Sequence, residues 1–348
     1  MFRRDFFKLM SVGSVGIGAT AATSVGFAAT VQPSTNARAS IQEAIDEVSR
    51  KGGGTVLMAA GEHRLDGELV IATDRIRLVG ESRATVLKAT QKDITLIHFA
   101  ASHGGVKNLS LSGGVSGVTA LRVEPRLPTP ADRTVHQNYN RFSNLYISGC
   151  AEGITLQAGS NVPERGDCGC WYNVFETILI IYTQRGVWLK SPVGDRGSSV
   201  NRNQFYSVRI GQFVNTGVQI DSGDTNSFVG CSFEGINKGK SPNATPTAIL
   251  VKRSASSGAD NNHNTFVCNR FEGNSLDLEN HNGYTELFSS SVAFGQDKFR
   301  GVNPLFVVGG SDPSFTPTIL PGMTISSTEV RYSKKVVFEK GATDATRG

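Results

Sequence analysis

The strongest constraint on the fold is a repeat, because residues 226–235 recur almost unchanged as residues 264–273. The two copies read Asn-Ser-Phe-Val-Gly-Cys-Ser-Phe-Glu-Gly and Asn-Thr-Phe-Val-Cys-Asn-Arg-Phe-Glu-Gly. Three earlier stretches, beginning at Asn140, Asn173 and Asn203, share the Asn-x-Phe start and carry apolar residues at the same offsets. In most copies a Gly and alternating aliphatic residues follow, and this period of two predicts strands. The clearest of these Gly-aliphatic segments are residues 153–156, 186–189 and 217–220.

A unit this short cannot bury its apolar face alone, so it must stack on copies of itself and build a solenoid. Successive Asn-x-Phe starts lie 33, 30, 23 and 38 residues apart. The shortest interval approximates one bare coil, and the excess in the others is loop, because turns tolerate insertions and strand register does not. We therefore predict an all-β fold, a single-stranded right-handed parallel β-helix (solenoid) with a short N-terminal capping helix.

Stacking places equivalent residues of adjacent coils above one another, ~4.8 Å apart along the axis. This register predicts an aromatic column inside the solenoid and a hydrogen-bonded amide ladder at one bend. The column comprises Phe175, Phe205, Phe228 and Phe266, and the ladder comprises Asn173, Asn203, Asn226 and Asn264.

One helix is expected, immediately before the first strands. The segment from Ser40 to Glu43 has the spacing of a capping box, and the glycines at 52–54 predict the end of the helix. Its single apolar stripe is suited to covering the open N-terminal end of the β-helix core. That stripe is Ile41, Ala44, Ile45 and Val48.

Residues 1–28 are typical of an export signal. Arg3 and Arg4 precede an apolar, glycine-rich run over residues 9–25, and residues 26–28 offer small side chains for cleavage. The arginine pair resembles the twin-arginine type of signal, which a receptor reads and which is removed afterwards. The expected location is periplasmic or secreted, with no stable membrane insertion after signal removal. The alternative is an anchor that stays attached.

Composition excludes some functions. The chain has 348 residues, of which 39% are hydrophobic and 19% charged, so it can bury a large core. Its net charge of +5 is weak, and no basic patch with interleaved aromatic residues occurs, so no nucleic-acid partner is expected. Five cysteines provide no disulfide framework, and the pair Cys168 and Cys170 lacks a second pair at metal-site spacing. We expect no metal and no other cofactor.

The segment that follows the expected helix resembles the start of the pectate-lyase-like superfamily. The likeness rests on the amphipathic helix, Gly-Gly-Gly-Thr-Val at 52–56, the small-residue turn near Gly61 and a leucine strand. With the Asn-x-Phe coils it covers roughly residues 38–290. We assign residues 38–302 to the β-helix domain and residues 303–348, which are rich in proline at first, to a closing tail.

This superfamily includes phage tailspike and rhamnogalacturonase-related proteins. The resemblance implies a polysaccharide partner and, by analogy with tailspikes, a homotrimer, with the tail as an interface segment. Its members include hydrolases, lyases, epimerases and binding proteins, so the resemblance alone fixes no chemistry. The Asn-x-Asp, Asp-Asp, Gly-His-Gly and Arg-x-Lys motifs of polygalacturonase-type hydrolases are absent, as is the epimerase motif Asp-Pro-His.

Insertions between coils fall mainly after the Gly-aliphatic segments, at residues 158–170, 191–202, 221–225 and 252–263. Since equivalent positions stack, these loops would form a wall along a groove. A sugar-binding cleft needs aromatic faces and charged groups, although solvated loops have the same composition. The predicted substrate-binding residues are Trp171, Asp195, Arg196, Arg202, Lys252, Arg253 and His263.

Two acidic pairs are candidates for catalysis. Asp221 and Asp224 lie close across a turn, where one could raise the pKa of the other, but the surrounding sequence is also ordinary turn composition. Glu234 and Glu272 occupy identical repeat positions, and carboxyl groups ~5–5.5 Å apart are typical of retaining glycosidases. Their alternative role is that of surface glutamates neutralised by neighbouring cations.

The sequence therefore predicts an exported enzyme that cleaves glycosidic bonds of a polysaccharide, with hydrolysis slightly favoured. Two alternatives stay open. One is a lyase, which needs a cation to neutralise a uronate carboxylate and a base to take a proton. The other is a non-catalytic β-helix that binds or scaffolds glycan.

Overall fold

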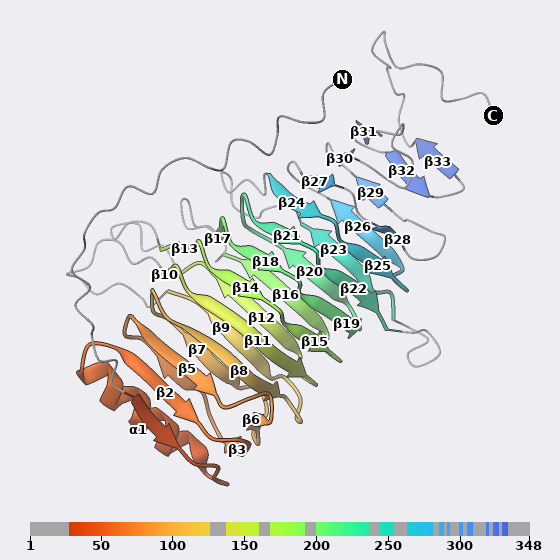
Figure 1. The fold of residues 1–348 in the computed structure, drawn as a ribbon. Helices are drawn as coiled ribbons and strands as arrows, with labels where there is room; N and C mark the ends of the chain where they lie inside the picture. The colour runs from red at the N-terminus through yellow and green to blue at the C-terminus, as the bar shows by residue number, and fades with distance from the viewer. Residues whose placement is uncertain are drawn as a thin grey trace, which may run out of the picture.

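The computed structural model of the chain describes residues 28–125, 137–159, 168–191, 200–236, 244–252 and 263–280, with shorter segments from 285 to 332. These residues form a right-handed parallel β-helix with one helix, α1 (Ala37–Arg50), at its N-terminal end. Figure 1 shows successive coils stacked along one axis from α1 towards the C-terminal strands. The predicted fold class is confirmed.

Three sheets run along the axis of the described part of the chain, and one of them combines two strands per coil. The 19-stranded sheet holds β1 (Ala28–Val31), β2 (Gly54–Met58), β3 (Gly61–Leu65), β5 (Ile76–Gly80), β6 (Thr85–Ala89), β8 (Gly105–Ser112), β11 (Arg141–Ser148), β14 (Val174–Glu176), β15 (Leu179–Ile181), β18 (Gln204–Tyr206), β19 (Arg209–Phe213), β21 (Ser227–Val229), β22 (Ser232–Gly235), β24 (Asn264–Val267), β25 (Arg270–Glu272), β27 (Thr285–Phe288), β28 (Ser291–Val292), β30 (Leu305–Val308) and β31 (Thr318–Ile319).

The 11-stranded sheet holds the Gly-aliphatic segments. Its strands are β4 (Leu69–Ile71), β7 (Thr95–Phe99), β9 (Thr119–Val123), β12 (Glu152–Gln157), β16 (Arg185–Lys190), β20 (Thr216–Ile220), β23 (Thr247–Val251), β26 (Leu276–Asn280), β29 (Phe299–Gly301), β32 (Met323–Ser326) and β33 (Glu329–Tyr332). A three-stranded sheet of β10 (Gln137–Asn138), β13 (Cys170–Trp171) and β17 (Val200–Asn201) lies just before the Asn-x-Phe strands. The sequence did not predict these short strands, of which β17 falls inside an expected loop and β13 overlaps the end of another.

Helix α1 packs its buried stripe on the first strands, as predicted, and includes Ala37 in that stripe. The expected capping box is wrong. The helix begins at Ala37, and the Ser40 hydroxyl donates to the Ala37 carbonyl at 3.0 Å instead of capping a free N–H group. The predicted end is confirmed: Gly53 N donates to Val48 O at 3.1 Å and Gly52 N to Ser49 O at 3.0 Å, which is a Schellman motif.

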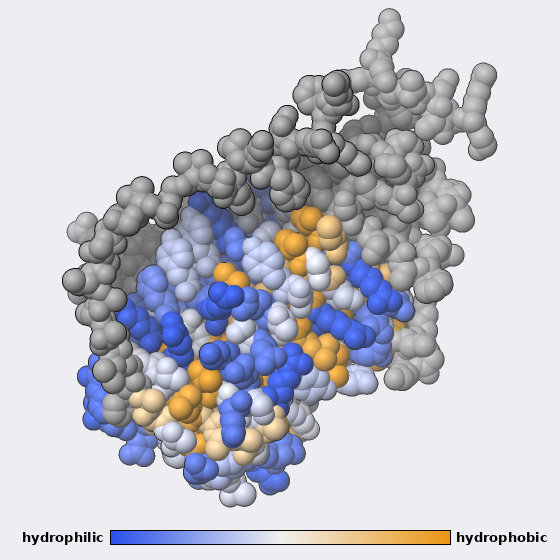
Figure 2. Space-filling view, viewed as in Figure 1, coloured by the Kyte–Doolittle hydropathy of each residue, from blue (hydrophilic) through white to orange (hydrophobic). Residues whose placement is uncertain are grey.

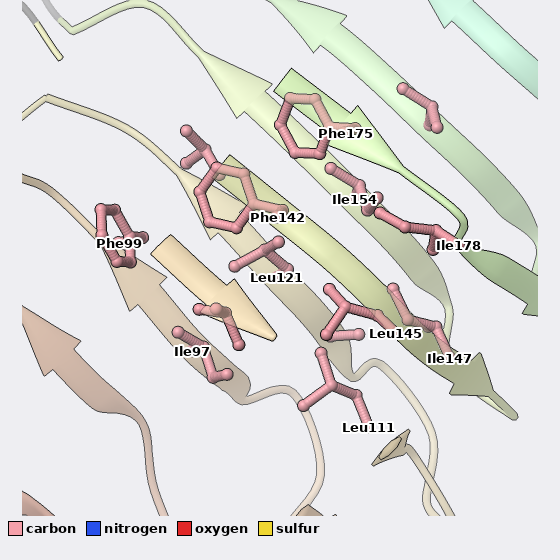
Figure 3. Close-up of a cluster of buried hydrophobic side chains, with 14 of the residues drawn as sticks. Ile97, Phe99, Leu111, Leu121, Phe142, Leu145, Ile147, Ile154, Phe175 and Ile178 are labelled. Carbon is pink, nitrogen blue, oxygen red and sulfur yellow. The ribbon is translucent and has the colours of Figure 1, made fainter. Parts of the chain in front are cut away.

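The core is the interior of the coil, where side chains from the 19-stranded and 11-stranded sheets face one another (Figure 3). The predicted aromatic column is confirmed and extends one coil further, to Phe142. Ring centroids of successive phenylalanines from Phe142 to Phe266 lie 4.8, 4.7, 4.4 and 4.8 Å apart, with interplanar angles of 11° or less. All five rings are buried.

The asparagine ladder is also confirmed, with Asn140 as an additional member. Each side-chain amide donates to the Oδ1 atom of the next asparagine at 2.9–3.0 Å, and that oxygen also accepts the backbone N–H of the preceding asparagine. Every member is buried, so the ladder satisfies backbone groups that water cannot reach.

All five cysteines lie among the described residues. Cys150, Cys168, Cys170 and Cys231 are buried, whereas Cys268 is exposed. Pairing becomes antiparallel near the C-terminal end, where β29 pairs with β32 and β30 with β31. No helix in the described residues is both long and apolar enough to cross a membrane.

Candidate functional site

The sequence-predicted site residues lie on three different sides of the coil. Glu234 and Glu272 pair in register on β22 and β25, as expected, and lie on the outer side of the 19-stranded sheet. Arg209 donates to Glu234 at 2.8 Å and Arg270 to Glu272 at 2.6 Å. Both arginines are more than half exposed, so these contacts are surface ion pairs of modest energy.

Asp221 and Asp224 have different partners. Asp221 follows β20 and accepts hydrogen bonds from Trp188 Nε1 at 2.7 Å and from Gln219 Nε2 at 2.6 Å. Asp224 lies at the corner beside β17, where its backbone N–H donates to Asn201 Oδ1 at 2.9 Å. The turn thus points the first aspartate to the 11-stranded sheet and fixes the second at the neighbouring corner.

The predicted substrate-binding residues are likewise divided. Trp171 on β13, Arg202 and His263 lie along the corner that holds the three-stranded sheet. Lys252 follows β23, with its Nζ atom 3.9 Å from Asp221 Oδ1. Asp195, Arg196 and Arg253 lie outside the described residues, as does most of the expected loop wall.

A denser group of charged and aromatic side chains covers the outer side of the 11-stranded sheet from β7 to β16. We call it the carboxylate cluster and define it by His98, Arg122, Glu124, Glu152, Arg185, Trp188 and Lys190. Parallel pairing brings them together: Glu152 is in register with Arg185, Thr155 with both Arg122 and Trp188, and Gln157 with Lys190.

Glu152 is held in an ion pair within the cluster. Arg185 Nη1 donates to Glu152 Oε1 at 3.0 Å, and the Thr155 hydroxyl donates to Oε2 at 2.8 Å. The side chains of Glu152 and Arg185 are each 22% exposed, so the pair is mostly removed from water but still reachable from one side. Such a hydrogen-bonded ion pair fixes the orientation of the carboxylate.

Glu124 has a different environment. It follows β9 and accepts a hydrogen bond from Gln157 Nε2 at 2.8 Å, with His98 Nε2 3.9 Å from its other oxygen. Burial raises the pKa of Glu124, an effect that the nearby charges of His98 and Arg122 only partly oppose. Two carboxyl groups in contrasting environments are typical of a general acid paired with a base.

The two carboxyl groups are anchored by one strand. Thr155 binds Glu152 and Gln157 binds Glu124, and these anchors are two residues apart on β12, or ~7 Å along the strand. The backbone positions of the glutamates are much further apart, because Glu152 is in register with Thr119 and Glu124 lies five residues beyond it. The side chain of Glu152 thus reaches along the sheet to Thr155, whereas that of Glu124 meets Gln157 beside it.

Two cations of the cluster lie against the ring of Trp188. The guanidinium carbon of Arg185 and the Nζ atom of Lys190 each lie 3.9 Å from the centre of the Trp188 ring. Burial lowers the pKa of Lys190, and the charges of Arg122 and Arg185 act in the same direction, whereas Glu152 and Glu124 oppose them. Trp188 also donates to Asp221, so one predicted catalytic residue does contact the cluster.

Two buried nitrogens of the cluster, Arg122 Nε and His98 Nε2, have no hydrogen-bond partner among the described residues. Buried polar atoms are nearly always hydrogen-bonded in folded proteins, so these two atoms have hydrogen-bonding capacity to offer a polar ligand. The described residues contain no group of three or more His, Cys, Asp or Glu side chains suited to holding a metal ion.

The sequence contains a signal for most of this cluster. In the aligned Gly-aliphatic segments, the positions between the aliphatic residues point outward, and they are occupied by Thr155, Trp188 and Gln219. Glu124 is harder to find, because its coil has Gly104 and Val106 where the repeat has Asn and Phe. Because that coil lacks the Asn-x-Phe mark, the repeat does not identify Glu124.

Comparison with known proteins gives a likeness in fold. No family model and no curated protein matches the sequence. Among solved structures, ORF18 of Geobacillus virus E2 superposes with a TM-score of 0.61 and 14% identity over 85% of this chain. The chain spans 64% of the length of that viral protein.

Two further structures superpose more loosely. The A-module of a mannuronan C-5 epimerase from Azotobacter vinelandii has a TM-score of 0.40 and 17% identity, over 75% of this chain and 70% of that one. The catalytic unit of a GH87 α-1,3-glucanase from Streptomyces thermodiastaticus has a TM-score of 0.42 and 13% identity, over 76% of this chain and 53% of that one. The superposition on ORF18 confirms the predicted resemblance at the level of the fold, a right-handed parallel β-helix.

Proposed function

We propose that this protein is an exported enzyme that cleaves glycosidic bonds of a polysaccharide by hydrolysis, at the carboxylate cluster. The observation that carries the proposal is that β12 holds Glu124 and Glu152 at anchors ~7 Å apart and in contrasting environments. The twin-arginine pattern of Arg3 and Arg4 supports export.

The contrast between the two carboxyl groups assigns their roles. Glu124, whose pKa is raised by burial, keeps a proton to a higher pH and donates it to the leaving oxygen as general acid. Glu152, held as an ion pair by Arg185, takes a proton from the attacking water as general base. Asp221 contributes indirectly, because it accepts the hydrogen bond that holds the Trp188 ring in place within the carboxylate cluster.

The separation of the two catalytic carboxyl groups sets the stereochemistry of hydrolysis. A separation of ~6.5–9.5 Å between carboxyl groups leaves room for a water molecule and is typical of inverting glycosidases. A separation of ~5–5.5 Å is typical of retaining enzymes. Proton NMR of the first product distinguishes the two arrangements, because an inverting enzyme gives the opposite anomeric configuration from the substrate and a retaining enzyme gives the same one.

A second candidate reaction is β-elimination, which Lys190 favours. Its lowered pKa makes the neutral amine more available as a base, and Arg122 and Arg185 lie in the same cluster to neutralise a uronate carboxylate.

The third candidate is a binding protein without activity. In that case the carboxylate cluster binds glycan but does not act as a general acid or base.

One assay separates the three. The mature protein is incubated with a panel of neutral and uronic-acid polysaccharides, and both new reducing ends and the ultraviolet absorbance of unsaturated products are followed. Reducing ends without new absorbance are expected and indicate hydrolysis. A rise in both signals indicates elimination. No product from any substrate, together with measurable binding, indicates the non-catalytic function.

A further inference from the structure

A second feature lies at the corner that precedes the asparagine ladder. Residues at this corner adopt the left-handed backbone conformation, with φ between 56° and 63°, in seven successive coils. Backbone hydrogen bonds between neighbouring coils place them in one line along the axis. We call this line the corner column; from the N-terminal end it is Arg75, His103, Tyr139, Tyr172, Arg202, Thr225 and His263.

The aromatic members of the corner column stack on one another. The ring centroids of His103 and Tyr139 are 5.4 Å apart, with an interplanar angle of 14°. Those of Tyr139 and Tyr172 are 5.2 Å apart, with an interplanar angle of 10°. The Arg202 guanidinium lies over the next face, 5.5 Å from the Tyr172 ring, and donates to the Tyr172 hydroxyl. The ring faces are therefore covered, and solvent meets ring edges and hydroxyl groups.

This stack is exposed, unlike the phenylalanine column inside the coil. Tyr139 is 56% exposed, more than any other large hydrophobic residue of the described chain, and every other member except the half-buried Tyr172 is also exposed. An aromatic ring is negative on its face and positive at its edge. A row of ring edges with phenol hydroxyls therefore favours oxygen-rich and negatively charged ligands.

Charge reinforces this preference. The seven positions contain two arginines and two histidines and no acidic residue. On one side the neighbouring row adds Arg77 and Arg141, the latter paired with Glu176. On the other side stand Asp74, whose carboxylate accepts the backbone N–H of Ser102, and Asp224.

We propose that the corner column is a second binding site, for an extended acidic polysaccharide that runs along the axis of the β-helix. The groups that meet the ligand recur once per coil, ~4.8 Å apart, so successive sugar residues of a linear polymer meet successive hydroxyl, imidazole and guanidinium groups. The Arg202 guanidinium retains further donors for a carboxylate or sulfate after its bond with Tyr172. This site is separate from the carboxylate cluster and does not depend on cleavage there.

The geometry favours a glycan over single-stranded nucleic acid, the other common polyanion. Proteins that bind single strands stack bases on free aromatic faces. In the corner column, neighbouring rings and Arg202 cover those faces, as the ring distances show. Trp171, which the sequence predicted as a sugar contact, lies in the adjacent row, with its indole folded over Gly169.

The test is binding by affinity electrophoresis in gels that contain a polyuronate, dextran sulfate or neutral dextran. The polyuronate and dextran sulfate arms distinguish carboxylate from sulfate as the recognised group. The wild-type protein should be retarded by at least one acidic polymer and not by dextran. Combined Tyr139→Ala and Tyr172→Ala substitutions should weaken that binding about tenfold or more, and Arg202→Gln about threefold to tenfold.

Matched controls lie elsewhere on the coil. Tyr182 has the same backbone conformation, with φ 56°, and is 54% exposed, but it belongs to a different corner. Tyr182→Ala and Arg209→Gln should bind as the wild type does. Tyr139→Phe with Tyr172→Phe preserves the stack, so a loss of binding in this variant is assigned to the hydroxyl groups.

Three outcomes would overturn the proposal. One is unchanged binding of acidic polymers in the folded alanine double variant, with folding checked by circular dichroism. Another is a loss of acidic-polymer binding in Tyr182→Ala that equals the loss in the alanine double variant. The third is displacement of the bound glycan by an equal charge concentration of single-stranded DNA. Glu124→Gln should bind the acidic polymer normally, so failure of catalysis at the cluster can be told apart from failure of this site.

Discussion

Asn203 donates its side-chain amide to Asn226 Oδ1 at 3.0 Å, and the same oxygen accepts the backbone N–H of Asn203. This arrangement repeats from coil to coil inside a bend that water does not reach. The ladder therefore couples the register of each coil to that of the next, and it positions both the corner column and the strands that carry the carboxylate cluster.

Asn203→Ala should destabilise the protein by about 2–4 kcal/mol, because it leaves the buried N–H of Asn173 without its acceptor and removes two amide donations. Chemical denaturation followed by circular dichroism measures the change. The adjacent Gln204 is exposed, and Gln204→Ala should change stability by less than about 0.5 kcal/mol. Equal effects of the two substitutions would show that the ladder is dispensable.

Phe205→Ala should cost about 3–5 kcal/mol, since it empties a fully buried position between two stacked rings. Tyr206 follows it on β18, points outward and is 37% exposed, so Tyr206→Ala is the matched comparison. The same unfolding experiment applies. A small loss in Phe205→Ala would mean that the column is not a principal part of the core.

Glu124→Gln should stabilise the protein at neutral pH, because the amide avoids the cost of ionising a partly buried carboxyl group. The pKa of Glu124 is raised in the folded state, so its favourable contribution is present below the unfolded pKa, ~4.3, and is lost as pH rises through the folded pKa. The advantage of the variant should therefore grow with pH. Unfolding curves at several pH values between acid and neutral measure it.

Glu62 provides a control of opposite sign. Hydrogen bonds with Arg64 and Lys88 lower the pKa of Glu62, so its contribution is present at neutral pH and is lost as pH falls through the folded pKa. Glu62→Gln should be destabilising at neutral pH and lose that effect in acid. A Glu124→Gln variant that behaves in the same way would show that Glu124 is stabilised as a carboxylate.

The fold follows from the sequence wherever the repeat is marked. The Asn-x-Phe starts set the ladder and the phenylalanine column, because a buried amide and a buried ring at one offset can only stack. The apolar stripe predicts helix α1. It does not predict the first turn, because the helix begins at Ala37, before the polar segment that has the spacing of a capping box. The short strands β10, β13 and β17 were missed because two residues per coil carry no detectable period.

The site was less accessible from sequence. The carboxylate cluster joins residues 33 positions apart, such as Glu152 and Arg185, and its members meet only when coils are aligned correctly. Glu124 stands in a coil that lacks the Asn-x-Phe mark. The corner column could have been read from the residue before each ladder asparagine, where Tyr139, Tyr172, Arg202 and His263 stand.

The most direct test of the proposed catalytic function compares four glutamate variants on a polysaccharide that the wild-type protein cleaves. Glu124→Gln and Glu152→Gln keep the shape of the side chain, and each should lower the rate of reducing-end release about 100-fold or more, because each removes a proton-transfer group. Glu234→Gln and Glu272→Gln lie on the 19-stranded sheet and should remain active. Full activity in both cluster variants, or loss of activity only in Glu234→Gln and Glu272→Gln, would contradict the assignment of the active site to the carboxylate cluster.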